Sequence, residues 1–128
     1  MIKEDYVSFE TAKLLKEKGF DFCCEFQYIN CSSGRPFLTD IRDDAGCYYK
    51  NSEIEQDAYS APTLQMAMKW LREVHNLYIT ITHRFSHNGD NDVCFGYYIN
   101  TNTAMDGEWL TYEEACEAAI KYCLELLP

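Results

Sequence analysis

Apolar residues recur at spacings of three and four positions in three segments of the chain, which is the pattern of amphipathic helices. The first segment runs from about Phe9 to Lys18, directly after Ser8 and directly before Gly19. A serine hydroxyl accepts hydrogen bonds from the exposed amides of a first helical turn, and glycine readily adopts the left-handed conformation that ends many helices. The pattern therefore predicts a helix with a defined start and a defined end.

Two further helices are predicted, from about Leu64 to His75 and from about Tyr112 to Leu127. Thr63 can cap the first of these with its hydroxyl. Thr111 and Glu114 match the capping box, in which each side chain satisfies an amide at the other end of the turn. The last helix carries many small residues on its apolar side, so we expect it to lie close against a sheet.

Strands are predicted where β-favouring residues cluster or alternate between turn signals. The predicted strands are Phe22–Ile29, Cys47–Lys50, Leu77–Phe85 and Val93–Asn100. The last two flank Asn88-Gly89, a strong turn signal because both residues accept positive φ, so we interpret this region as a β-hairpin. We expect the second predicted strand to pair with the first.

The order of these elements is α-β-β-α-β-β-α, which indicates the α+β class. We predict a single domain over residues 1–128, built as an antiparallel sheet of three to five strands with helices packed on one face. The opposite face would stay in water or contact a second copy. The stretch from Asp40 to Ser60 is acidic and irregular, and we expect a surface excursion there.

The charge balance narrows the range of partners. The sequence has 21 Asp and Glu against 11 Lys and Arg, for a formal net charge of −10. This balance argues against a nucleic-acid partner, because such binding requires a basic face that displaces counterions. An acidic surface suits a basic protein, or a mimic of nucleic acid that competes for one. The chain shows neither a long apolar stretch nor a secretion signal, so we expect a cytoplasmic protein with no membrane partner.

Seven cysteines are present, an odd number that favours free thiols in a reducing compartment over a disulfide framework. No C-x-x-C pair typical of zinc sites occurs, and the six glycines form no phosphate-binding loop. We therefore predict no metal and no cofactor. Cys116 and Cys123 fall on one helical face and are expected to be buried. Cys94 and His83 could face each other across the predicted hairpin, which leaves a small enzyme with a Cys/His centre as an alternative.

Aromatic residues make up 15% of the chain, and tyrosine is common at binding surfaces because it covers a large area at low entropic cost. The tyrosines on predicted strands form the candidate binding surface: Tyr28, Tyr48, Tyr49, Tyr97 and Tyr98. We interpret the accompanying phenylalanines as core residues: Phe26, Phe85 and Phe95. Such a surface could bind another protein or a second copy of this chain.

A resemblance to a known family is carried by three segments, VSFETAKLLKEKGF, SAPTLQMAMKWLREVHNLYI and TYEEACEAAIKYCLELL. In these segments the chain resembles uncharacterised small proteins encoded in Bacteroides genomes and in their phages and mobile elements. The resemblance covers roughly residues 7–20, 60–81 and 111–127, which contain the three predicted helices. It implies an intracellular bacterial or phage setting and an accessory role. No activity is attached to that family, so the resemblance assigns no functional residue.

Three functions are compatible with these patterns. The leading hypothesis is a non-enzymatic accessory protein that binds an unknown protein or a second copy of itself. It predicts an exposed aromatic or acidic patch without a deep polar pocket. The alternatives are an acidic nucleic-acid mimic that inhibits a host protein, and the small enzyme with Cys94 and His83 at its centre.

Overall fold

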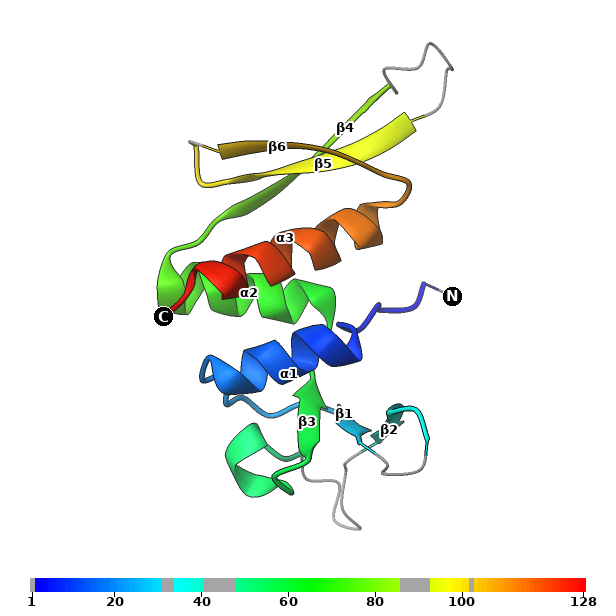
Figure 1. The fold of residues 1–128 in the computed structure, drawn as a ribbon, viewed down its shortest axis with the longest axis vertical. Coiled ribbons are helices and arrows are strands. Elements are labelled where there is room, and N and C mark those ends of the chain that lie inside the picture. Colours follow the sequence, from blue (N-terminus) through cyan, green and yellow to red (C-terminus); the bar gives the residue numbers. More distant parts are fainter. Residues whose placement is uncertain (1, 31–33, 41–47, 86–92, 102) are drawn as a thin grey trace. The chain divides into compact units, whose positions relative to one another are not determined.

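The computed structural model has three helices and two small antiparallel sheets, which confirms the α+β class (Figure 1). It describes residues 2–30, 34–40, 48–85, 93–101 and 103–128, with residues 103–107 described by their backbone. The chain divides into two compact units, Met1–Thr63 with Pro128 and Leu64–Leu127. The prediction of a single domain over residues 1–128 stays a prediction.

Helix α1 spans Phe9–Glu17, one residue shorter than predicted. The Ser8 hydroxyl accepts a hydrogen bond from the amide of Thr11 at 3.3 Å, which is the predicted N-cap. At the other end Gly19 has a φ of +94°, the left-handed conformation that glycine adopts without steric cost. The signals at both ends of this helix are therefore confirmed.

Helices α2, Leu64–His75, and α3, Tyr112–Leu126, also match the predicted segments. The residue after α2, Asn76, has a φ of 56°, and asparagine tolerates this left-handed position better than most residues. The Thr111 hydroxyl caps α3 by accepting from the amide of Glu114 at 3.1 Å. Local sequence chemistry thus marks both ends of α1, the end of α2 and the start of α3.

The first unit contains a sheet of short strands in the order β2-β1-β3. Its strands are β1 Phe26–Ile29, β2 Phe37–Asp40 and β3 Ala58–Ala61. Both pairings are antiparallel, and they place Tyr28 opposite Tyr59. The Phe9 ring of α1 meets both tyrosines edge-on, with centroids 5.8 Å from Tyr28 and 5.5 Å from Tyr59. These aromatic contacts hold α1 on one face of the sheet.

The predicted strands of this unit are longer than the observed ones. Of Phe22–Ile29, the part from Phe26 onward forms β1. The predicted partner strand Cys47–Lys50 is reduced to one antiparallel bridge between Cys24 and Tyr49, and Cys47 lies outside the described residues. The neighbours of β1 are β2 and β3, neither of which was predicted.

The described part of residues 40–60 is more ordered than we predicted. It contains β3 and the 3₁₀ turn η1, Asn51–Glu53. Asn51 is buried, donating from Nδ2 to the Phe20 carbonyl at 2.7 Å and accepting the Ser60 amide at 2.8 Å. A buried amide side chain that satisfies two backbone groups fixes its segment, because losing either bond would strand a polar group away from water. The segment from Asn51 to Ser60 is therefore a pinned loop rather than an irregular excursion.

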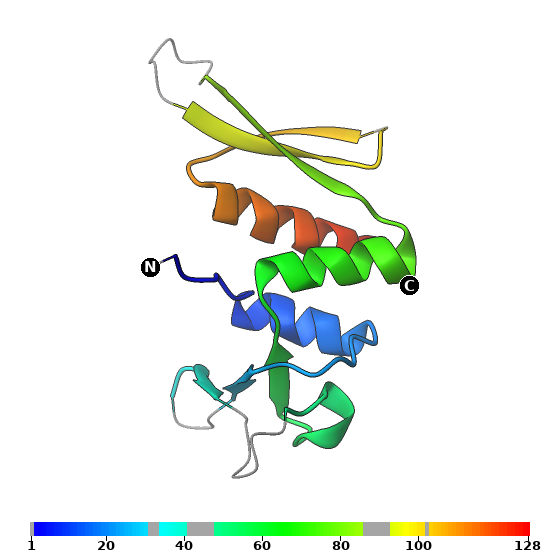
Figure 2. The same ribbon diagram turned by 180° about the vertical axis from the view of Figure 1, so that it is seen from behind.

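The second unit contains a sheet of seven-residue strands in the order β4-β5-β6. Its strands are β4 Ile79–Phe85, β5 Val93–Ile99 and β6 Thr103–Trp109. The predicted pairing of β4 with β5 is confirmed, while its Asn88-Gly89 turn lies outside the described residues. Strand β6 was not predicted. Strands β4 and β6 are the two edges of this sheet. Figure 2 shows the same unit from behind, with α3 between the strands and α2.

Helix α3 packs between this sheet and α2, so it is buried on two sides. The fully buried side chains of α3 are Ala115, Cys116, Ala119, Ile120, Cys123 and Leu124. The prediction that Cys116 and Cys123 are buried is confirmed. Because the helix is covered on two sides, its apolar surface is broader than a single stripe. Its small residues allow close approach on both sides.

The arrangement of the strands differs from the single sheet that we predicted. The described residues form two sheets of three strands each. Strands β2, β3 and β6 account for the difference, because each lacks a clear run of strand-favouring residues and is held by pairing with a neighbour. None of the helices in the described ranges has both the length and the apolar character of a membrane-crossing segment.

Candidate binding surfaces

The five predicted binding tyrosines are divided between the two units. Tyr28, Tyr48 and Tyr49 belong to the first, and Tyr97 and Tyr98 to the second. Tyr48 and Tyr98 are exposed, which fits a binding role. That role itself stays a prediction for each of them.

Tyr97 is a core residue, which corrects its place in the predicted surface. Its side chain is 4% exposed, and its ring lies 5.2 Å from Trp109 and 6.2 Å from Tyr122. Burial raises the pKa of the Tyr97 hydroxyl. Tyr28 is partly buried, and its hydroxyl donates to the Val7 carbonyl at 2.7 Å. Both side chains help to hold their own unit together.

An exposed apolar surface lies instead where β4 ends and β5 begins. Phe85 and Val93 are paired across the strands there, and they are 68% and 44% exposed. The next pair on the same face is His83 with Phe95, whose rings are 6.5 Å apart. Tyr112 meets Phe95 edge-on at 6.4 Å. We call these five residues the aromatic strip.

The aromatic strip continues the inner face of the sheet beyond the area that α3 covers. Residues paired directly across antiparallel strands share a face, and alternate pairs return to that face. Ile81 with Tyr97, His83 with Phe95 and Phe85 with Val93 are therefore on one side. Figure 1 shows the strands drawing away from α3 toward the end that carries Phe85. Phe85 is exposed, which corrects its interpretation as a core residue. The alternation of residues along β4 indicates which side chains share this face. It does not indicate how far along the face the covering helix α3 extends.

The proposed Cys/His centre is excluded by the register of the hairpin. His83 is paired with Phe95, whereas Cys94 is paired with Arg84. Successive residues of a strand point to opposite faces, so the His83 imidazole and the Cys94 thiol lie on different sides of the sheet. Proton transfer between them would require hydrogen-bond reach on one side. Whether the chain has any enzymatic activity is a separate matter that the register leaves as a prediction.

Three buried thiols, those of Cys24, Cys116 and Cys123, are held in their protonated form. Burial raises the pKa of Cys24 and Cys123 to about 12 each, and that of Cys116 to about 11. A thiol must ionise to act as a nucleophile or a metal ligand. Among the described residues, no group of three or more His, Cys, Asp or Glu side chains could hold a metal ion. Cys23, by contrast, is exposed.

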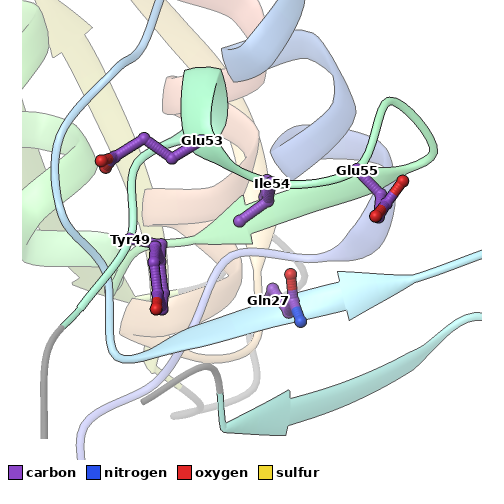
Figure 3. Close-up of a pocket in the computed structure, with 5 residues that line it drawn as sticks. All are labelled: Gln27, Tyr49, Glu53, Ile54 and Glu55. Carbon is purple, nitrogen blue, oxygen red and sulfur yellow. The ribbon is translucent and has the colours of Figure 1, made fainter. Parts of the chain in front are cut away.

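A small hollow on the first unit brings one predicted tyrosine together with acidic and amide groups (Figure 3). Its volume is about 240 Å³, and it is lined by Gln27, Tyr49, Glu53, Ile54 and Glu55. Figure 3 shows Tyr49 and Gln27 below Ile54, with the two carboxylates on opposite sides. The hollow is below the roughly 300–1,000 Å³ typical of small-molecule sites. It therefore fits a single side chain better than a cofactor.

The hollow is shaped by the pinned loop described above. Gln27 lies on β1, on the face opposite the neighbouring Tyr28, because the two residues are adjacent in a strand. On the other side of the hollow, Oε1 of Glu53 accepts the backbone amide of Lys50 at 2.9 Å. Asp21 accepts from both the amide and the hydroxyl of Ser52, and these bonds lower the pKa of the Asp21 carboxyl. The wall of the hollow is thus held by several independent contacts.

No protein-family model, curated protein or solved structure matches this chain. The resemblance to small proteins of Bacteroides and their phages therefore stays an expectation from the sequence.

Proposed function

We propose that this chain is a cytoplasmic accessory protein that acts by binding another protein through the aromatic strip. The observation that carries the proposal is the paired exposure of Phe85 and Val93, 68% and 44%, directly beyond the buried core. Burying an exposed phenylalanine or valine stabilises a complex by about 2 kcal/mol each. Apolar and aromatic residues of this kind form the central contacts of many protein interfaces.

The charge around the strip supports a basic rather than an acidic partner. Glu113 and Glu114 are exposed in the first turn of α3, next to Tyr112 of the strip. The whole chain carries a net charge of −10, so a positively charged protein would be attracted before contact. A second copy would meet electrostatic repulsion. We therefore favour a different protein over a homodimer.

The test is a comparison of two single substitutions that remove similar apolar groups from different places. Phe85→Ser removes a ring of the strip that is 68% exposed, and Val74→Ser removes a side chain of α2 that is 51% exposed. Proteins retained by the immobilised wild-type chain in an extract of its native cells are identified. Each is then purified and titrated against the three chains by calorimetry.

The expected result is a partner whose Kd rises at least tenfold for Phe85→Ser and stays within twofold for Val74→Ser. A tenfold change corresponds to about 1.4 kcal/mol, which is less than the full cost of losing a buried phenylalanine. A partner that binds the wild-type and Phe85→Ser chains equally well would refute the strip as the contact surface. Circular dichroism of each variant confirms that the fold is kept.

A further inference from the structure

The loop beside the hollow already binds one cation on its inner side. Nζ of Lys16 donates to the carbonyl oxygens of Glu55 at 3.0 Å, Gln56 at 3.4 Å and Ala58 at 2.7 Å. The same ammonium lies 5.2 Å from the ring centroid of Tyr59, within the range of a cation–π contact. The Lys16 ammonium is therefore bound by carbonyl oxygens and by a tyrosine ring that packs against it.

The outer side of the same loop presents the same kinds of groups to solvent. The ring of Tyr49, the side-chain amide of Gln27 and the carboxylate of Glu55 all line the hollow (Figure 3). Glu55 therefore serves both sides, with its carbonyl toward Lys16 and its carboxylate at the hollow. Both sides of the loop thus bring oxygen acceptors and a tyrosine ring together, and the hollow does so in contact with solvent, whereas burial lowers the pKa of Lys16 on the inner side.

We infer that the hollow receives the side chain of an arginine from a partner protein. A guanidinium is planar and stacks on aromatic rings, and its five N–H donors can reach several acceptors at once. Stacked on Tyr49, it can donate to the carbonyl oxygen of Gln27 and to the carboxylate of Glu55, whereas Oε1 of Glu53 already accepts the Lys50 amide. A compact ammonium lacks the plane that stacks on a ring while its edge donates to two acceptors.

The size and charge of the site agree with this occupant. A volume of about 240 Å³ fits one long side chain. The net charge of −10 favours an arginine-bearing partner in the encounter as well. Binding is expected to weaken as salt is added, because the hollow is open to solvent and exposed charges are screened. The site lies in the first unit, so it does not depend on the aromatic strip of the second.

The test uses the full chain and three small probes observed by NMR. N-acetyl-arginine amide is titrated into the ¹⁵N-labelled protein, and the side-chain amide of Gln27 and the backbone amides of 49–55 are followed. N-acetyl-lysine amide carries a positive charge but lacks the planar guanidinium group, and N-acetyl-norleucine amide lacks both. We expect saturable shifts with the arginine probe in the millimolar range, at least threefold weaker binding of the lysine probe, and no saturable shift with norleucine.

Substitutions distinguish the hollow from general attraction to an acidic protein. Glu55→Gln and Tyr49→Leu are each expected to weaken binding of the arginine probe at least threefold. Glu73→Gln, which removes an exposed carboxylate from α2, should leave the affinity for the arginine probe unchanged. Glu55→Gln keeps the backbone carbonyl that Lys16 uses, so its fold is expected to stay intact.

Three outcomes would overturn the inference: equal binding of the lysine probe, saturable shifts with norleucine, or no effect of Glu55→Gln. Phe85→Ser should leave the arginine probe unaffected. The aromatic strip and the hollow can therefore fail independently.

Discussion

The two units of this chain use different interactions to hold sheets with the same number of strands. In the first unit, strands of four residues are supported by side chains that bond to backbone groups, as Asn51 and Lys16 do. In the second, strands of seven residues are covered by an apolar helix that includes Ile120 and Leu124. Short strands bury little apolar area, so directional bonds contribute a larger share of the order there.

This comparison also explains why the two candidate surfaces differ in kind. Where polar contacts hold a loop in place, the loop can present acceptors outward, as the hollow with Glu55 does. Where apolar strands extend beyond their covering helix, the exposed remainder is apolar, as Phe85 shows. Each surface is an extension of the interactions that hold its own unit together.

The largest effect is expected from opening the apolar core of the second unit. Leu124→Ala removes a side chain that is 0% exposed, and the loss of transfer energy together with the cavity should cost about 3 kcal/mol. Leu126→Ala on the same helix removes a leucine that is 54% exposed and should cost less than about 1 kcal/mol. Urea unfolding measures both. Similar losses for the two variants would contradict the assignment of the core.

The matching experiment in the first unit removes the buried Asn51 side chain, which bonds to two backbone groups. Asn51→Ala leaves the Phe20 carbonyl and the Ser60 amide without their bonds, and should cost about 2 kcal/mol. The exposed Asn30 gives the control, since Asn30→Ala should change the unfolding free energy by less than about 0.5 kcal/mol. If Asn51→Ala lowered the free energy of unfolding no more than Asn30→Ala does, other contacts would have to hold the loop.

Alkaline pH should weaken the second unit through the two buried thiols of α3. Their folded pKa values, about 11 for Cys116 and about 12 for Cys123, lie above the value near 8.5 of an unfolded cysteine. Above pH ~8.5 the unfolded chain releases protons that the folded chain retains. Stability should therefore fall as pH rises, by about 1.4 kcal/mol per pH unit for each thiol, until the folded pKa is reached.

Urea midpoints of the reduced protein between pH 7 and pH 10 measure this slope. Cys116→Ala and Cys123→Ala should each make it shallower. A slope that neither variant alters would mean that other groups cause the alkaline loss.

The smallest expected effect tests the cation on the inner side of the loop. Lys16→Met keeps most of the apolar stem but removes the ammonium that three carbonyl groups accept from, and should cost about 1 kcal/mol. Lys13→Met, on an exposed position of the same helix, should have almost no effect on the unfolding free energy. Equal urea midpoints for the two variants would show that the carbonyl contacts add little to stability.

Helices could be predicted well from the sequence because their limits are chemical and local. The hydroxyl of Ser8, the hydroxyl of Thr111 and the left-handed Asn76 act within one turn of the residues that they limit. Strands β4 and β5 could be predicted because they combine β-branched and aromatic residues with alternation. In each case the signal and the structure lie in the same short segment.

The remaining strands could not be predicted because their structure depends on distant partners. Strand β3 reads AYSA and β6 reads TAMDGEW, and neither is rich in strand-favouring residues. The role of Asn51 was missed for a similar reason. An asparagine in a polar stretch is typical of a loop, and its bonds to Phe20 and Ser60 reach 31 and 9 residues along the chain. Of the candidate sites, Tyr49 was found from its residue type, while the carboxylates around it were not.

The position of β4 at the edge of its sheet has a consequence for how the purified protein behaves. An unpaired edge offers a row of backbone amides and carbonyls to any extended chain, and natural edges are often blunted by lysine, proline or a bulge. The sequence ITITHRF of β4 has neither lysine nor proline. Repulsion between copies of net charge −10 reaches about 10 Å in 0.1 M salt and about 3 Å in 1 M salt. Concentrated salt would therefore remove the charge barrier that opposes self-association along this edge.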